Sequence, residues 1–382
     1  MSLYAAQEQD LARLAAATRR RRLIPREGAD FSSNDYLGLA ASGLLEDEVR
    51  KALDRGVPVG SGGSRLLRGN HAEHEALEED AARFFGCGSA TWFPTGYAAN
   101  SALLSTLPQT GDLIVHDELV HASAHEGIRL SRAEAAPFRH NDPEDAERLI
   151  RRWRLESGKG RIWIALETLY SMDGDCAAID AFMALADRHG AVLLADEAHA
   201  TGVIGEAGKG LTAHLGGREN LITLRTFGKA LGCEGALLCG PAVLRDFLVN
   251  RARGFIFSTA PSPLMAAVAR AALRLQAERE DLRGELRALV RHAETVLAPL
   301  GALASGSQIL PLIVGDDSAA MALAQHVQAA GLDVRGIRPP TVPEGTARLR
   351  ISITRNVSAA DIDRLAAVLA EAKAELAGNR AA

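Results

Sequence analysis

Four short segments of the chain place chemically versatile side chains directly after apolar, strand-like runs. The carboxyl ends of parallel strands gather at one edge of an α/β sheet, and such sheets bind their ligands there. We therefore expect the side chains of these segments to serve one site. The segments are FPTGYAAN (93–100), VHASAH (120–125), AVLLADEAHATG (191–202) and LRTFGKALG (224–232).

Each segment taken alone has an ordinary structural interpretation beside the functional one. Asp196 is either a ligand-binding carboxylate or a cap for the segment that follows. Lys229 is either a solvated turn residue or a Schiff-base nucleophile, since desolvation lowers the pKa of a lysine and frees its amine. The helix start at Gly96 and Tyr97 would suit a phosphate dianion, although many α/β connections have this form.

One cofactor, pyridoxal 5′-phosphate, explains all four segments together. Lys229 would bind it as a Schiff base, and Asp196 would pair with the pyridine nitrogen. That ion pair raises the pKa of the ring nitrogen, so the protonated ring can accept the electrons of a carbanion. His199 would hydrogen-bond the phenolic oxygen, and His121 would stack on the ring. The groups predicted to hold the phosphate are Gly96, Tyr97 and Thr226.

The elements that must position these residues alternate between apolar strands and amphipathic helices from about residue 71. This alternation predicts an α/β domain with a mostly parallel central sheet that is buried on both faces. Helical patterns cover 71–85 and 142–154. The strand-like runs are SATWF (89–93), DLIVH (112–116), RIWIAL (161–166), AVLLAD (191–196), LITLRT (221–226) and GALLCG (235–240).

The two ends of the chain have a different texture. Residues 2–22 read as a helix, which Pro25 and Gly28 end. After about residue 260, long helical patterns over 262–299 precede strand-like segments and a last helix that begins near Ser358. The strand-like segments are ILPLIVG (309–315), LDVRGI (332–337) and ARLRISIT (347–354). We therefore predict an N-terminal helical arm (1–30), a large α/β domain (31–260) and a smaller C-terminal α+β domain (261–382).

Composition excludes several classes of protein. The 382 residues include 43 Lys and Arg against 48 Asp and Glu, a net charge of −5, which offers no electrostatic case for nucleic acid or a membrane surface as partner. No stretch approaches the ~18 apolar residues of a membrane span, and the N-terminus has no apolar signal-peptide core. His121 and His125 have zinc-ligand spacing but lack the accompanying Glu, so we expect no metal. Four cysteines fit a reducing, cytoplasmic compartment.

Seven strings, in this order along the chain, resemble the α-oxoamine synthases, a family of fold-type-I pyridoxal-phosphate enzymes. Each string is moderately specific, and the seven together are very specific. The resemblance covers about residues 11–371 and is strongest to the branch of the family that serves biotin biosynthesis. The strings are FSSNDYLGL (31–39), GSGGSRLLRGNHAEHEALEE (60–79), PTGYAAN (94–100), YSMDGD (170–175), DEAHATGVIG (196–205), TFGKALG (226–232) and RPPTVPEGTARLRISIT (338–354).

The resemblance implies a role for each matched residue. Lys229 is the Schiff-base lysine and general base, Asp196 pairs with the pyridinium, and His199 and Ser171 contact the ring substituents. His121 stacks on the ring. The residues implied in substrate binding are Asn34 and Arg350 for the amino-acid carboxylate, Thr341 for the acyl chain, and an N-terminal arginine whose register is open, Arg19 first and Arg20 second. The string GCEGA (232–236) departs from the family with Cys233 and Glu234.

The implied reaction is the decarboxylative condensation of L-alanine with a pimeloyl thioester, carried by coenzyme A or by an acyl carrier protein, in a homodimer. The nearest alternative is a sister synthase, such as glycine C-acetyltransferase, 5-aminolevulinate synthase or serine palmitoyltransferase. Ser64 favours alanine over glycine, since a small residue there leaves room for the methyl group, although one methylene discriminates by only ~1–3 kcal/mol. The alternative from another class is an α/β binding protein or hydrolase without the cofactor, in which Lys229 is a turn residue.

Overall fold

The computed structural model describes residues 2–156 and 158–381. They form two compact units. The sheet unit consists of Leu37–Ser171 and Cys176–Arg283, and the terminal unit consists of Met1–Tyr36, Met172–Asp175 and Gly284–Ala382. Each is described by itself below.

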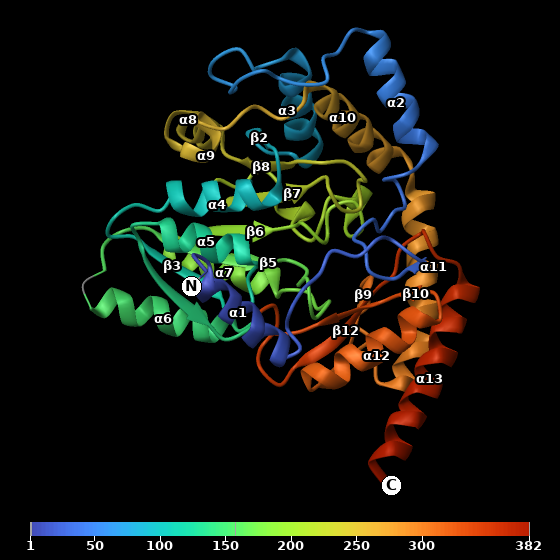
Figure 1. Ribbon diagram of the computed structural model, residues 1–382. Coiled ribbons are helices and arrows are strands. Elements are labelled where there is room, and N and C mark those ends of the chain that lie inside the picture. Colours follow the sequence, from blue (N-terminus) through green and yellow to red (C-terminus); the bar gives the residue numbers. More distant parts are fainter. Residues whose placement is uncertain (1, 157, 382) are drawn as a thin grey trace. The chain divides into compact units, whose positions relative to one another are not determined.

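A seven-stranded sheet forms the centre of the sheet unit, in the order β2-β8-β7-β6-β5-β3-β4 (Figure 1). Strand β8 is antiparallel to both neighbours, and the other strand pairs are parallel. This arrangement confirms the predicted α/β class with a mostly parallel sheet. The strands are β2 (Ser89–Phe93), β3 (Leu113–Asp117), β4 (Glu134–Phe138), β5 (Ile162–Glu167), β6 (Val192–Asp196), β7 (Leu221–Thr226) and β8 (Ala236–Gly240).

Helices cover both faces of this sheet, which explains why its central strands are continuous apolar runs. Helices α4, α5, α8 and α9 pack with strand residues in one buried cluster, and α6 and α7 pack on the opposite face in a second. Helix α10 packs against α2 and α3. The helices are α2 (Gly43–Asp54), α3 (Ala72–Phe85), α4 (Gly96–Thr106), α5 (Ala122–Leu130), α6 (Pro143–Leu155), α7 (Ile179–His189), η1 (Glu206–Gly208), η2 (Ala213–Leu215), α8 (Ala242–Arg251), α9 (Arg253–Ile256) and α10 (Pro263–Glu278).

The terminal unit joins both ends of the chain through a small pair of strands. Its antiparallel sheet has the order β11-β12-β9, and β1 pairs with β10 in parallel. Helices α12 and α13 pack together in this unit. The elements are α1 (Ala5–Ala16), β1 (Ala29–Asp30), α11 (Glu280–Leu297), which begins in the sheet unit, η3 (Ala298–Leu300), β9 (Ile309–Gly315), α12 (Asp317–Ala329), β10 (Leu332–Asp333), β11 (Arg335–Ile337), β12 (Ala347–Ser352) and α13 (Ala359–Ala381).

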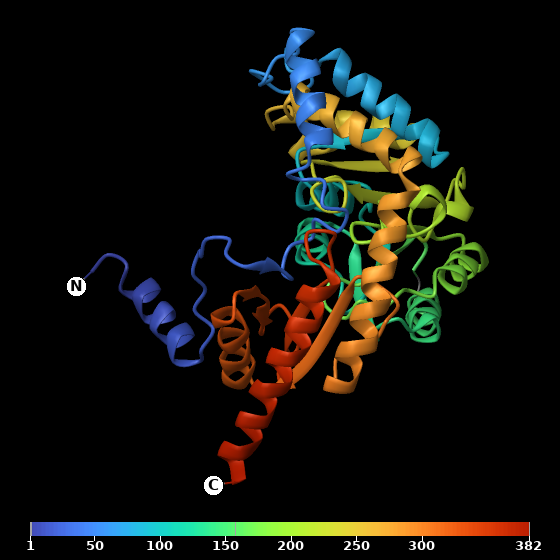
Figure 2. The ribbon, with the colours of Figure 1, turned by 90° about the vertical axis from the view of Figure 1, so that its right-hand side faces the viewer.

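The predicted helix over residues 2–22 is too long. Helix α1 ends at Ala16, none of its residues is buried, and it stands apart from α12 in Figure 2. Thr18 follows with a left-handed φ of 57°, which ends the helix. The arginine run at 19–22 therefore lies outside the helix. Its first residue, Arg19, contacts the distant Asp317 at 2.6 Å.

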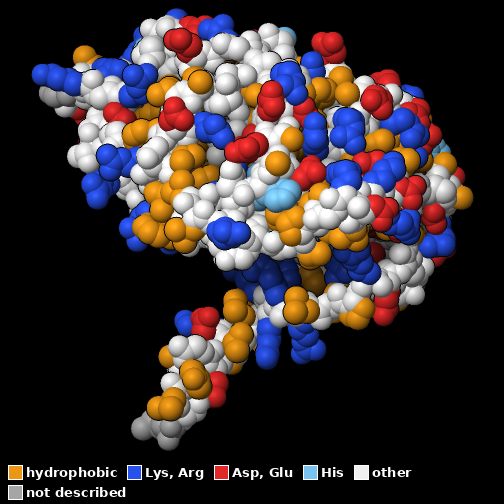
Figure 3. All heavy atoms as spheres, turned by 90° about the horizontal axis from the view of Figure 1, so that it is seen from above, with side chains coloured by type: hydrophobic (Ala, Val, Ile, Leu, Met, Phe, Trp, Pro, Cys, Tyr) orange, Lys and Arg blue, Asp and Glu red, His pale blue; other side chains and the backbone are white. Residues whose placement is uncertain are grey.

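The compact units change at residues 36 and 283, whereas the sequence placed boundaries at 30 and 260, and that three-part division stays a prediction. Helix α10 accounts for the difference at the second boundary, since it packs on α2 and α3 of the sheet unit. Lys and Arg side chains are interspersed with Asp and Glu on the face seen in Figure 3. Within the described residues, every helix is too short or too polar to cross a membrane.

Candidate active site

A cavity of about 500 Å³ opens at the carboxyl ends of β5, β6 and β7 in the sheet unit. Seven of the residues predicted from sequence line it, so the four segments do meet at one edge of the sheet as expected. These residues are Gly96, Tyr97, His121, Asp196, His199, Thr226 and Lys229.

Lys229 lies three residues beyond the end of β7, and its Nζ is 2.8 Å from Nε2 of His199. His199 is buried and follows β6. This contact pairs an amine with a group that can accept or return a proton. It is the arrangement that an activated lysine nucleophile requires.

Asp196 ends β6 and is held by two donors. The Ala198 N–H donates to Oδ1 at 2.9 Å, and the Asn100 amide of α4 donates to Oδ2 at 2.8 Å. Both hydrogen bonds stabilise the ionised carboxylate. A negative charge is thereby fixed at the wall of the cavity.

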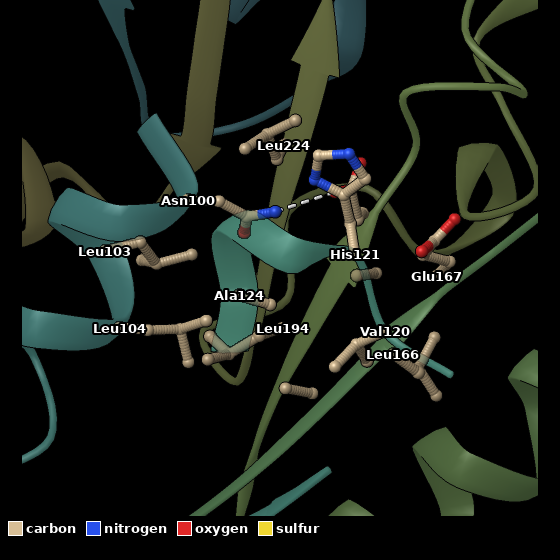
Figure 4. A pocket seen from close by; sticks show the side chains of 13 residues that line it. Asn100, Leu103, Leu104, Val120, His121, Ala124, Leu166, Glu167, Leu194 and Leu224 are labelled. Atoms are coloured by element: carbon tan, nitrogen blue, oxygen red, sulfur yellow. Dashed lines mark hydrogen bonds between the residues drawn. The ribbon is translucent and has the colours of Figure 1, made fainter. Parts of the chain in front are cut away.

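Asn100 also connects Asp196 to His121 through Ser123, and Figure 4 shows Asn100 and His121 at the pocket that both line. Its amide donates to Ser123 Oγ at 3.1 Å, and Ser123 Oγ lies 2.8 Å from Nδ1 of His121. Burial lowers the pKa of His121, and the Lys229 charge adds to this against the opposing effect of Asp196. The ring is therefore neutral and fixed in orientation at neutral pH.

Helix α4 begins at the cavity with Gly96, behind Thr95, whose side chain caps the helix by accepting from the Ala98 N–H at 3.0 Å. A Cβ on Gly96 would lie 2.6 Å from Cγ2 of Thr226, so only glycine fits there without a shift. The Thr226 hydroxyl donates to the Ala198 carbonyl at 3.2 Å. The helix start thus presents its backbone N–H groups at close range, as anion sites do.

Glu167, the last residue of β5, also lines the cavity and was not predicted. It is 3% exposed, and its Oε2 accepts a hydrogen bond from the Ser171 N–H at 3.1 Å. Burial, and then the neighbouring Asp196, raise its pKa to about 8. Ser171 was predicted to contact the ring and is not among the residues that line this cavity.

The predicted carboxylate-binding pair lies in the terminal unit. The Arg350 guanidinium is buried and donates to Asn34 Oδ1 at 3.0 Å, to the Tyr36 hydroxyl at 3.2 Å and to the Ser352 hydroxyl at 2.7 Å. All three acceptors are uncharged. A guanidinium has the forked N–H geometry that binds a carboxylate through two hydrogen bonds.

The N-terminal arginines differ in their contacts. Arg19 donates to Asp317 at 2.6 Å and to Glu344 at 2.6 and 2.9 Å, and Arg20 is exposed. The guanidinium beside Thr341 belongs to Arg21, at 3.1 Å from its hydroxyl. The structure therefore brings Thr341 together with Arg21, which the sequence did not single out.

Three residues at the cavity or beside it were not predicted, although the sequence pattern around two of them could have indicated them. Asn100 stands in the string PTGYAAN, one helical turn beyond Gly96, and Glu167 ends an apolar strand as Asp196 does. Ser123 carried no signal of its own. The departures Cys233 and Glu234 both line the cavity.

Comparison with known proteins is consistent with this geometry. The model of the aminotransferase class I and II family matches residues 26–369. The 8-amino-7-oxononanoate synthase of Chromobacterium violaceum is 42% identical over 88% of this chain and 86% of its own, and that of Geobacter sulfurreducens is 40% identical over 92% and 90%. A putative 8-amino-7-oxononanoate synthase 2 of Bacillus velezensis is 39% identical over 92% and 90%.

Solved structures share the whole fold. A serine palmitoyltransferase of S. paucimobilis with bound PLP superposes with a TM-score of 0.89 at 26% identity, over 99% of this chain and 100% of that one. An 8-amino-7-oxononanoate synthase from Francisella tularensis gives 0.75 at 25% identity, over 91% and 99%. These two solved structures are similarly distant in sequence, so the distinction rests on the 8-amino-7-oxononanoate synthases that are 40% and 42% identical to this chain. The chain belongs to the aminotransferase class I and II family and, within it, to the 8-amino-7-oxononanoate synthases.

Proposed function

We propose that this chain condenses L-alanine with a pimeloyl thioester, using pyridoxal 5′-phosphate, and releases 8-amino-7-oxononanoate, carbon dioxide and the free thiol. The observation that carries the proposal is the cavity in which Lys229, His199 and Asp196 meet, in a chain about 40% identical to 8-amino-7-oxononanoate synthases. The relatives do not favour a sister synthase, and the neighbour with bound PLP argues against an α/β protein without the cofactor.

The residues that line the cavity fit the cofactor. Lys229 would hold it covalently, Asp196 would face its ring nitrogen, and His121 its ring plane. His199 would lie toward the ring substituents, and we propose the same for Ser171. The N–H groups of Gly96 and Tyr97, with the Thr226 hydroxyl, would hold the phosphate.

Once bound, the cofactor supplies an electron sink for a carbanion at Cα of the amino acid. After the amino group of the substrate has released Lys229 from the cofactor, the freed amine takes the Cα proton, and His199, 2.8 Å from its Nζ, holds that amine in the orientation needed. The nucleophilic carbon then attacks the thioester carbonyl and expels the thiol. After carbon dioxide leaves, Lys229 returns a proton to Cα.

Two different bonds at Cα are broken in turn, so the carboxylate of the amino acid must be held in place between the steps. We propose that Arg350 and Asn34 hold it, with the fork of the guanidinium facing the two oxygens. For the acyl chain we propose Thr341. Arg19 was the first choice for the N-terminal arginine and Arg20 the second, and the contact at Thr341 now favours Arg21 over both.

We further propose that the enzyme is a homodimer in the cytoplasm. A content of four cysteines in 382 residues supports a reducing compartment. Coenzyme A and an acyl carrier protein are both chemically competent carriers of the thioester.

Thiol release from pimeloyl-CoA, with L-alanine and glycine compared on PLP-loaded protein, tests the proposal. We expect release that depends on alanine and is much weaker with glycine. Lys229→Ala should abolish it, whereas Lys51→Ala, a change at an exposed lysine of α2, should not. Turnover that survives in Lys229→Ala, or that prefers glycine, would contradict the assignment.

A further inference from the structure

Two buried glutamates stand at neighbouring strand ends in the sheet unit and have opposite environments. Glu197, directly after β6, is fully buried and accepts four hydrogen bonds. The donors are Thr168 Oγ1 at 2.7 Å, Leu211 N at 3.1 Å, Thr212 N at 2.7 Å and Thr212 Oγ1 at 2.6 Å. Surroundings that supply only donors suit a carboxylate group, whose ionised oxygens can only accept.

Glu167 has no such set of donors. Its Oε2 accepts from the Ser171 N–H, while its Oε1 is buried and has no hydrogen-bond partner among the residues that the structure describes. The side chain nevertheless faces the cavity wall, beside His121 in Figure 4. A buried ionised oxygen without a donor is expensive, whereas a protonated one is itself a donor that can face a bound molecule.

The carboxylates near Glu167 also favour its neutral form. Glu167 and Asp196 are register partners on the parallel strands β5 and β6, so their side chains leave the sheet on the same face. Two adjacent carboxyls do not both ionise readily in a desolvated site. Asp196 accepts hydrogen bonds from two donors, which favour an ionised carboxylate, whereas Glu167 accepts from one. Asp117, like Asp196, raises the pKa of Glu167. The positive charge of Lys229 lowers it and so acts against these two carboxylates.

We propose that Glu167 is a neutral carboxylic acid in the working enzyme and a positioning residue of the cofactor site. Its O–H faces the cavity, and its neutrality leaves Asp196 as the charged member of this pair of carboxyls. The inference rests on the function proposed above. It adds a residue whose role depends on being uncharged. An ionised carboxylate at this position would compete with Asp196 for the ring nitrogen of the cofactor.

The holoenzymes of wild type, Glu167→Gln and the matched control Glu197→Gln distinguish these environments. An amide is the uncharged counterpart of a carboxylic acid, so Glu167→Gln should leave the pH midpoint of the bound cofactor's absorbance change in place. Its affinity for PLP should stay within about threefold, since no charge is lost. Glu197→Gln should lower the thermal midpoint strongly, because the amide nitrogen, itself a donor, would then face two of the four donors. Infrared difference spectra should show a protonated carboxyl band at pH 7 in wild type that Glu167→Gln lacks.

An ionised Glu167 would give the opposite results. Removing its charge near Lys229 would then lower the absorbance midpoint by about one pH unit or more, and no carboxylic acid band would be lost. A Glu167→Gln chain that does not fold would also overturn the proposal, since a neutral acid tolerates its amide. Failure of the wild type to bind PLP at all would refute the proposed function instead, so the two failures are distinguishable.

Discussion

Replacing Gly96 by alanine should disturb the start of helix α4 by a predictable amount. The new Cβ would lie 2.6 Å from Cγ2 of Thr226, closer than atoms in van der Waals contact, so Thr226 or the helix start must move. Overpacking of this kind costs about 1–3 kcal/mol of the free energy of unfolding. Because the helix start is proposed to hold the phosphate, PLP affinity should fall about twofold to tenfold if half of that strain is expressed at the site.

Urea unfolding of each variant, with PLP titration alongside, measures both effects. Gly43→Ala is the matched control, since Gly43 also opens a helix, α2, with nothing within 4 Å of its Cβ position. It should be neutral or stabilising by about 0.4–1 kcal/mol. Thr226→Ser removes the clashing methyl and keeps the hydroxyl, so the double variant Gly96→Ala/Thr226→Ser should recover part of the loss. A Gly96→Ala protein as stable as wild type, or no recovery in the double variant, would refute the reasoning.

Three further predictions concern single interactions. Asn100→Ala should weaken PLP binding about tenfold to a hundredfold in an absorbance titration, because its amide donates to the Asp196 carboxylate and such bonds contribute about 1.5–3 kcal/mol. Burial lowers the pKa of His116, so the unfolded chain binds a proton that the folded chain does not. Stability should therefore fall as pH drops below the unfolded pKa of about 6.5, and His116→Gln should flatten this slope in urea unfolding. The Cys239 thiol lowers the pKa of the Cys87 thiol, so iodoacetamide should alkylate Cys87 before the buried Cys239, as read by peptide mass mapping.

Each of these has a control in the chain. Ser123→Ala removes the other partner of Asn100 and should affect PLP binding less, so equal losses would count against the charge-assisted bond. His214 is exposed, and His214→Gln should keep the wild-type pH slope. Faster labelling of Cys239 than of Cys87 would show that exposure and thiol acidity do not act as described.

Much of the sheet unit could be predicted because its strands are buried on both faces. The predicted bounds of β2 and β7 match the structure, those of β6 and β8 start one residue early, and those of β3 and β5 are shifted by one residue at both ends. Strand β4 was missed, since it lies at the sheet edge, is mostly solvent-exposed and contains Pro137. It has no apolar run to reveal it.

The prediction of a helix over residues 2–22 was wrong for a different physical reason. The partners that hold Arg19, Asp317 and Glu344, lie about three hundred residues further along the chain, so no local pattern could place that segment. At the site, strand ends identified Asp196 and Lys229. Glu167 was not predicted because the sequence does not distinguish a buried glutamic acid from a solvated glutamate, and only the structure shows that this one is buried.

The hydrogen bond between Asn34 and Arg350 joins residues 316 positions apart in sequence. Chains are synthesised at roughly 5–20 residues per second, so Asn34 leaves the ribosome about 15–60 s before its partner. In the last part of that interval, after residue 240 has been made, every strand of the sheet unit is present, while the unit built from both chain ends is still incomplete. A nascent chain can therefore complete the cavity around Lys229 well before it acquires the buried guanidinium, and any early capture of the cofactor would precede the ability to hold an amino acid.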